Sequence, residues 1–190
     1  MLKIQTTDLA DVLVISTRWF TDDRGSFTET YNRQRWVDAG ITTEFVQDNH
    51  VVSTKAGTLR GMHYQTQPAA QAKLVRAVKG AIWDAVVDLR HGSPSFGQWF
   101  GLELSAENRL QLLVPVGFAH GYVTLTDDAE VLYKVDNFYS PSHEGGMVWN
   151  DPAVGIQWPL PASRLVIAPR DAALPTLAEL PPLFTWESPR

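Results

Sequence analysis

The chain has 190 residues, of which 44% are hydrophobic, 19% charged and 11% aromatic, as is usual for a folded globular protein. Its net charge of -5 disfavours nucleic-acid binders and proteins of anionic membrane surfaces, which need a basic face. The absence of cysteine excludes disulfides, thiolate nucleophiles and cysteine-based metal sites, and it fits a cytoplasmic location.

The N-terminal segment contains one short apolar run, Val12–Ile15. This run is too short for the core of a signal peptide and far too short to span a membrane. We therefore expect a cytoplasmic protein that binds neither membrane nor nucleic acid. The length favours one domain over residues 1–190, with a proper hydrophobic core.

Apolar residues recur mainly with a period of two and are interrupted by Gly, Pro, Asp and Asn, which is typical of β-strands. The predicted strands are 12–16, 26–31, 44–52, 58–65, 71–79, 81–89, 98–104, 110–114, 120–126 and 129–136. A short helix is predicted over 33–38, with Gly40 as its C-terminal cap. Many short strands favour a sandwich or small barrel over alternating strands and helices.

Eight of the 12 prolines lie at or beyond Pro152. Proline has no backbone N–H to donate to the interior of a sheet. We expect residues 152–190 to form loops and short helices that pack on the β body.

Two pairs of predicted strands are separated by two-residue turns, at 79–80 and 127–128. The first turn predicts a hairpin in which Lys73 and Asp84 are diagonal neighbours on one face. The second predicts a hairpin with Tyr122 opposite Tyr133. Turn type decides both registers, and a slip of one residue reverses every side chain.

The first polar cluster covers residues 59–65 and contains His63. A histidine titrates near neutral pH, so His63 is a candidate acid or base. A core histidine with both nitrogens satisfied is an equally good interpretation. Strict alternation would send Arg60 and His63 to opposite faces, so a shared site requires a bulge, for which Gly61 is the obvious place.

The second cluster covers residues 115–122 and contains His120. This histidine could be a metal ligand, a substrate contact or a buried spacer. Metal-binding cupins usually offer a His-x-His pair, but Gln65 stands where the second histidine would follow His63. Two histidines without that pair make a poor three-ligand site. We therefore expect no metal.

The third group is cationic and comprises Arg24, Arg60, Lys73 and Arg170. Most lysines and arginines are solvated surface residues. Arg60 and Lys73 lie within apolar strand patterns, however, and inward cations would suit a diphosphate. Asp171 and Tyr133 are unremarkable in composition and spacing.

Together these segments resemble the dTDP-4-dehydrorhamnose 3,5-epimerase family. The similarity runs from about residue 20 to about residue 171, and its motifs occur in the family's order. The matching stretches are 23–29, 47–49, 59–65, 72–75, 87–90, 93–97, 115–121, 133–134 and 149–152.

The resemblance implies a mainly β, cupin-type jelly roll, usually a homodimer, that uses no metal or organic cofactor. It implies inversion of C3 and C5 of dTDP-4-dehydro-6-deoxy-D-glucose on the way to dTDP-L-rhamnose. Hydrogens next to the C4 ketone are acidic because the carbanion delocalises into an enolate. A base on one face and an acid on the other would then invert each centre.

The resemblance also implies roles for single residues. His63 would be the base, Asp171 would orient it, Tyr133 would be the acid, and Lys73 would stabilise the enolate oxygen. The implied substrate contacts are Arg24, Glu29, Gln47, Asp48, Asn49, Arg60, Lys73, His120, Glu144 and Arg170. Of these, Arg24 and Glu29 would reach into the partner subunit. Arg170 departs from the family, which often has lysine at this position.

Several alternatives share this scaffold. An epimerase acting on C3 or C5 alone, or a 3,4-ketoisomerase, would differ in the placement of the acid and the orientation of the sugar. A non-catalytic sugar-nucleotide-binding jelly roll would bind without proton exchange. A metal-dependent cupin would need the missing His-x-His pair.

Overall fold

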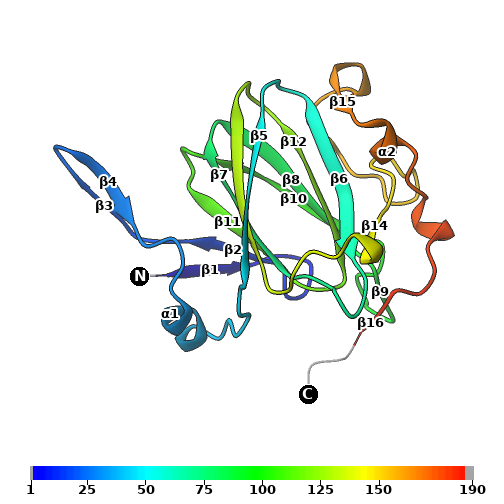
Figure 1. Cartoon of the computed structure of the whole chain (residues 1–190), viewed down its shortest axis with the longest axis horizontal. Coiled ribbons are helices and arrows are strands. Elements are labelled where there is room, and N and C mark those ends of the chain that lie inside the picture. Colours follow the sequence, from blue (N-terminus) through cyan, green and yellow to red (C-terminus); the bar gives the residue numbers. More distant parts are fainter. Residues whose placement is uncertain (1, 187–190) are drawn as a thin grey trace.

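The computed structural model describes residues 2–186 as two antiparallel β-sheets that face each other (Figure 1). The first sheet has the order β1 (Lys3–Thr6), β2 (Leu13–Ser16), β11 (Leu110–Val114), β7 (Lys73–Lys79), β13 (Ala129–Val135) and β5 (Gln47–Ser53). The second has the order β10 (Trp99–Ser105), β8 (Ala81–Asp88), β12 (Phe118–Thr124), β6 (Thr58–Gln65) and β14 (Glu144–Gly146). The prediction of a mainly β jelly roll is confirmed.

Strands that follow each other in the chain often lie in opposite sheets. After Gly80 the chain leaves β7 in the first sheet and enters β8 in the second, and β12 and β13 are separated in the same way. Both predicted hairpins are therefore wrong. The apolar pattern did not reveal the switch because β8 is buried on both faces: Val86 faces the first sheet, whereas Val87 packs under the C-terminal segment.

The main hydrophobic core fills the space between the sheets. Its residues come from both, including Val75 and Leu112 from the first and Ile82 and Leu104 from the second. Each fully buried aliphatic side chain contributes about 1.5–3 kcal/mol relative to an exposed one. This packing holds the facing strands, and the polar side chains between them, at fixed positions.

The short helix α1 (Arg33–Asp38) packs on the outer face of the first sheet. Asn32 caps its start by accepting the Arg35 N–H at 3.2 Å. At its end Gly40 has a φ of +89°, and the Ile41 N–H bonds to the Trp36 carbonyl at 2.9 Å. The predicted helix and its glycine cap are confirmed, because this pair of features is a standard helix stop.

The described part of the C-terminal segment after Asp151 covers the outer face of the second sheet. It contains short helices and two-residue strands. They are η2 (Ala162–Arg164), β15 (Val166–Ile167, parallel to β6), α2 (Pro169–Ala172), η3 (Leu177–Glu179) and β16 (Phe184–Thr185, parallel to β9, Arg90–His91). Residues 187–190 lie outside the described chain. No helix in the described residues is long and apolar enough to cross a membrane.

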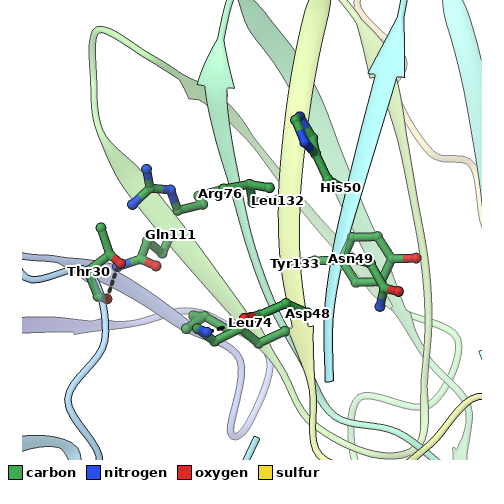
Figure 2. A pocket seen from close by; sticks show the side chains of 10 residues that line it. Thr30, Asp48, Asn49, His50, Leu74, Arg76, Gln111, Leu132 and Tyr133 are labelled. Atoms are coloured by element: carbon green, nitrogen blue, oxygen red, sulfur yellow. Dashed lines mark hydrogen bonds and ion pairs between the residues drawn. The ribbon is translucent and has the colours of Figure 1, made fainter. Parts of the chain in front are cut away.

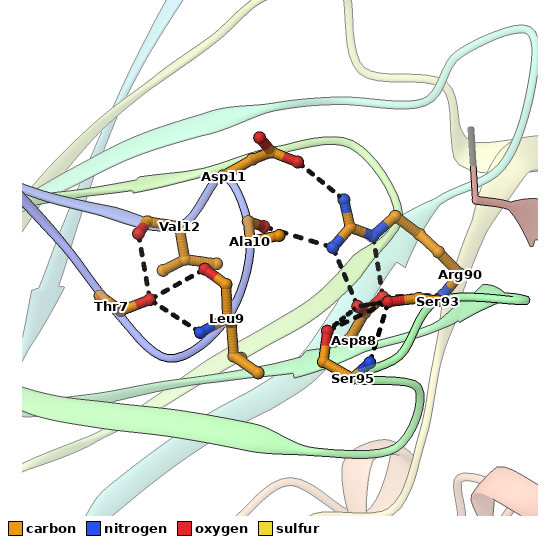
Figure 3. Close-up of polar contacts among 9 residues, drawn as sticks. All are labelled: Thr7, Leu9, Ala10, Asp11, Val12, Asp88, Arg90, Ser93 and Ser95. Atoms are coloured by element: carbon orange, nitrogen blue, oxygen red, sulfur yellow. Dashed lines mark hydrogen bonds and ion pairs between the residues drawn. The ribbon is translucent and has the colours of Figure 1, made fainter. Parts of the chain in front are cut away.

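A buried ionic network joins the N-terminal loop to the loop after β8 (Figure 3). Asp88 accepts hydrogen bonds from Arg90 and from the hydroxyls of Ser93 and Ser95 at 2.7–2.9 Å. Arg90 also reaches Asp11 at 3.1 Å. These bonds and the guanidinium favour the charged form, so the pKa of Asp88 is lowered despite the opposing effect of burial.

The hairpin of β3 (Trp19–Asp22) and β4 (Gly25–Thr28) projects away from the sandwich (Figure 1). One strand was predicted here over 26–31, but β4 ends at Thr28, and β3 was missed. The hairpin exposes 52% of Phe20 and 67% of Phe27. The hairpin therefore presents two large aromatic side chains on the surface of the chain.

Candidate active site

A cavity of about 390 Å³ opens between the two sheets. It draws side chains from β5, β7 and β13 of the first sheet, from β6 and β12 of the second, and from α2. The lining residues are Val51, Arg60, His63, Lys73, His120, Tyr122, Tyr133, Ala168, Arg170 and Asp171. Residues predicted from distant parts of the sequence therefore meet in one place.

His63 is held by Asp171 on one side of this cavity. Its Nε2 lies 2.9 Å from Oδ1 of Asp171, and the other carboxylate oxygen accepts the Gly61 N–H at 3.2 Å. Nδ1 has no hydrogen-bond partner within residues 2–186. Burial lowers the pKa of His63 below its ordinary value, against the opposing effect of Asp171. A neutral imidazole at neutral pH can accept a proton, and the carboxylate would stabilise the imidazolium.

The bulge predicted at Gly61 is confirmed. His63 pairs with His120, and Arg60 pairs with Tyr122. Between these two pairs β6 therefore contains one more residue than β12. Gly61 has a φ of +128°, and an added Cβ would lie 2.5 Å from the Cα of Gly121. Only glycine fits this close approach. The extra residue lets Arg60 and His63 face the same cavity.

Lys73 enters the cavity from β7 and donates a hydrogen bond from Nζ to the His63 carbonyl oxygen at 3.3 Å. Burial lowers its pKa to about 8, against the opposing effects of the Asp84 and Glu144 carboxylates. The ammonium therefore persists at neutral pH. A charged donor in a buried cavity can stabilise an oxyanion effectively.

His120 is paired with a carboxylate that the sequence interpretation did not assign to the site. Asp84 is 0% exposed, and its two oxygens lie 2.9 and 3.0 Å from Nε2 of His120. The available signal was a single acid at an inward position of an apolar strand. The predicted proximity of Asp84 to Lys73 is real, although it arises across the sheets and not within a hairpin.

Two tyrosines line the cavity. Burial raises the pKa of Tyr133 above its ordinary value, so its hydroxyl keeps its proton at neutral pH and can donate it. Tyr122 lies nearby and was not predicted as a site residue. Burial raises its pKa to about 12.

Arg170 and Glu144 form an ion pair at the side of the cavity. The Tyr139 hydroxyl donates a hydrogen bond to Glu144 at 2.6 Å. Burial opposes ionisation, but these two partners lower the pKa of Glu144. Tyr139 was missed because a single aromatic residue in a polar loop has no pattern of its own.

Three predicted contact residues lie on strand β5, and their side chains point to both faces of the sheet. Gln47 and Asn49 share the face of Val51, which lines the cavity, and they bond to each other at 2.9 Å. Asp48 points to the opposite face, where it pairs with Lys134 at 2.7 Å. There a second cavity of about 340 Å³ lies on the outer side of the sheet (Figure 2).

Arg24 and Glu29 lie outside the cavity of their own chain. Arg24 is at the tip of the projecting hairpin, pairs with Asp22 at 2.6 Å and has 91% of its side chain exposed. Glu29 pairs with Arg35 at 3.0 Å. Their predicted substrate contacts would therefore have to be made in another subunit.

Among residues 2–186, no group of three or more His, Cys, Asp or Glu side chains could hold a metal ion. His63 and His120 are each engaged by a carboxylate. The Gln65 side chain bonds to the backbone of Ser140. The expectation of a metal-free site stays a prediction.

Comparison with known proteins gives a consistent result. The family model for dTDP-4-dehydrorhamnose 3,5-epimerase matches residues 6–179. A dTDP-4-dehydrorhamnose 3,5-epimerase of Salmonella typhimurium is 50% identical over 179 residues, which are 93% of this chain and 96% of the relative.

Solved structures show the same similarity. A 3,5-epimerase from Legionella pneumophila, in complex with dTDP-4-keto-L-rhamnose, is 39% identical with a TM-score of 0.94 and covers 99% of this chain and 100% of its own. A 3'-monoepimerase from Streptomyces bikiniensis, in complex with dTDP-quinovose, is 34% identical with a TM-score of 0.84. That match covers 90% of this chain and 86% of the monoepimerase.

Proposed function

Because this chain belongs to the dTDP-4-dehydrorhamnose 3,5-epimerase family, we propose that it inverts C3 and C5 of dTDP-4-dehydro-6-deoxy-D-glucose. The product would be dTDP-4-dehydro-L-rhamnose, in dTDP-L-rhamnose biosynthesis. The observation that carries the proposal is the cavity into which His63, paired with Asp171 of α2, and Tyr133 extend from opposite sheets.

The cavity supplies each group that the chemistry needs. Neutral His63 takes a proton from the carbon beside the C4 ketone through the nitrogen that does not contact Asp171. The electron pair moves onto the ketone oxygen, where the Lys73 ammonium stabilises the enolate. Tyr133 then gives its proton to the carbon from the opposite face. Exchange with solvent then removes the proton from His63 and returns one to Tyr133, so the same steps at the second carbon complete the double inversion.

Arginines around the cavity would bind the diphosphate. Arg60 makes one hydrogen bond, to Ser53 at 3.3 Å, so most of its N–H donors are available within the described structure. Arg170 lines the cavity on the side of α2. A guanidinium can bind phosphate through two parallel hydrogen bonds. His120, fixed by Asp84, would contact the sugar.

A homodimer in which the β3–β4 hairpin completes the partner's site is part of this proposal. The hairpin projects from the sandwich and exposes Phe20, Phe27 and Arg24. Mixing an Arg24→Ala chain with a His63→Ala chain should restore activity, since half of the heterodimer sites would then be intact. No recovery despite demonstrated subunit exchange would contradict donation across the interface.

One experiment tests the reaction directly. The protein is incubated with the 4-keto sugar nucleotide in deuterium oxide, and the deuterium is located by NMR. We expect deuterium and inversion at both C3 and C5. Binding without exchange would identify a non-catalytic binding protein instead.

A single-centre epimerase is the second candidate, because the similar 3'-monoepimerase shares this fold. It predicts inverted product at one carbon only. The 3,5-epimerase of Salmonella typhimurium, at 50% identity, is more similar to this chain than the monoepimerase at 34%, which favours double inversion. The cytoplasmic location and the absence of nucleic-acid or membrane partners stay predictions.

A further inference from the structure

Gln65 lies two residues after His63 on β6 and is 5% exposed. Its Oε1 accepts the Ser140 N–H at 2.9 Å, and its Nε2 donates to the Ser140 carbonyl oxygen at 2.9 Å. The carboxamide therefore binds both backbone groups of one residue, as a neighbouring strand would. Gln65 clamps the loop of residues 137–143 to the strand that carries the proposed base.

This loop is connected to the cavity through Arg170, which lines it. Tyr139 precedes the clamped Ser140, and Glu144 follows the loop and lies opposite Gln65 in the register of β6 and β14. The Tyr139 hydroxyl donates to Glu144, which in turn pairs with Arg170. The position of Ser140 thus sets where this polar chain lies.

The other side-chain hydrogen bonds that hold the loop each engage a single backbone group. The Thr66 hydroxyl donates to the His143 carbonyl oxygen at 3.3 Å, which also accepts the Thr66 N–H at 2.8 Å, and the Asn137 amide donates to the Pro68 carbonyl oxygen at 3.0 Å. Gln47 accepts the Tyr139 N–H at 3.2 Å, and Gln71 donates to the Asn137 carbonyl oxygen at 2.7 Å. Each fixes one backbone group, whereas Gln65 fixes a donor and an acceptor of the same residue. Loss of the Gln65 carboxamide would leave both backbone groups of the partly buried Ser140 without these bonds, so replacing Gln65 should displace the loop.

We propose that Gln65 is a positioning residue for the nucleotide-sugar site, which acts through Ser140 to place Tyr139 and Glu144 and does not touch the reacting atoms. This inference rests on the proposed function. It requires that loss of the clamp weakens binding of the sugar nucleotide. Turnover of the bound substrate should change little, because the Gln65 carboxamide does not contact His63 or Tyr133.

Gln65→Glu tests the clamp because a protonated carboxyl has the same donor and acceptor as the carboxamide. The ionised carboxylate has acceptors only, and one of them would face the Ser140 carbonyl oxygen. Ionisation of the introduced group is opposed by burial and by Glu144 across the strand pair. It is favoured by Lys73, which contacts the His63 carbonyl, and by His143 of the loop when protonated.

KM and kcat should be measured from about pH 5 to about pH 8 for the natural protein, Gln65→Glu, Gln65→Met and Gln98→Glu. Gln98 is an exposed residue whose side chain donates to the Pro94 carbonyl at 3.4 Å, so it provides the matched control. The KM of Gln65→Glu should be about equal to that of the natural protein at about pH 5 and about tenfold higher at about pH 8. Its kcat should stay within about threefold of the natural value. Gln65→Met should raise KM throughout, and the control should change nothing.

Hydrogen exchange at the Ser140 amide provides a readout independent of turnover. Its protection should fall in Gln65→Met, and in Gln65→Glu only after the carboxyl ionises. Unchanged protection, an unchanged KM or a fall in kcat alone would overturn the inference. If the natural protein shows no epimerisation, the proposed function fails, and the inference about binding fails with it. Amide protection would still show whether the clamp exists.

Discussion

Raising the pH from about 7 to about 9 should remove the proton from Lys73 and slow the proposed reaction. Burial lowers the pKa of this lysine to about 8, so about nine-tenths of it is protonated at pH 7 and about one-tenth at pH 9. If only the ammonium stabilises the enolate, kcat/KM should fall about tenfold over this interval. On the acid side, the rate should fall only below the ordinary pKa of histidine, because burial lowers the pKa of His63.

The assay is the initial rate of deuterium incorporation at C3 and C5 as a function of pH. Lys73→Met removes the titrating group, so its rate should be lower at pH 7 and should show no decline near pH 8. Tyr133 does not interfere, since burial raises its pKa above the usual value for tyrosine. If the rate of the natural protein did not change between pH 7 and 9, or if Lys73→Met showed the same decline, the alkaline fall in rate could not be assigned to Lys73.

Five further outcomes are expected. His63→Ala should abolish deuterium incorporation, with a loss of about 10²–10⁴-fold. Tyr133→Phe should still incorporate deuterium but form little inverted product. If Tyr133→Phe lost deuterium incorporation and inversion equally, the assigned roles would be contradicted. Asp171→Asn should behave as a weakened His63 variant, with deuterium incorporation slowed at both carbons, because the imidazole loses its orienting carboxylate. Asp88→Asn should lower the free energy of unfolding by about 3–5 kcal/mol, measured with denaturant, because it leaves buried Arg90 without its main partner. Exhaustive chelation should leave activity unchanged. If chelation abolished activity and only an added metal restored it, the metal-free mechanism would be excluded.

Local features of this fold could be predicted from the sequence because their causes are local. The strand 58–65 follows from alternating side chains and the end of the helix 33–38 from the cap at Gly40, and both elements have the predicted bounds. The bulge at Gly61 followed from the requirement that Arg60 and His63 share a face. Each inference used interactions between residues close in the chain.

The pairing of strands could not be predicted in the same way. A turn at Gly80 is compatible with a hairpin and with a crossing between sheets, and only packing around β8 decides between them. Asp84 was missed for a related reason, since its partner His120 lies on the adjacent strand of a sheet whose order was unknown. Tyr133 and Asp171 were identified through the family resemblance, because neither has a distinctive local pattern.

The alternation of successive strands between the two sheets also bears on how the protein folds. Neither sheet can form from consecutive segments, so long loops must close before the native pairs stabilise the chain. Folding should therefore be slow compared with that of a helical bundle of equal length. His63 and Tyr133 belong to different sheets, so neither half of the sandwich can assemble the site alone. In a refolding experiment, the return of enzymatic activity should report the final docking of the sheets and should follow the recovery of β-sheet circular dichroism.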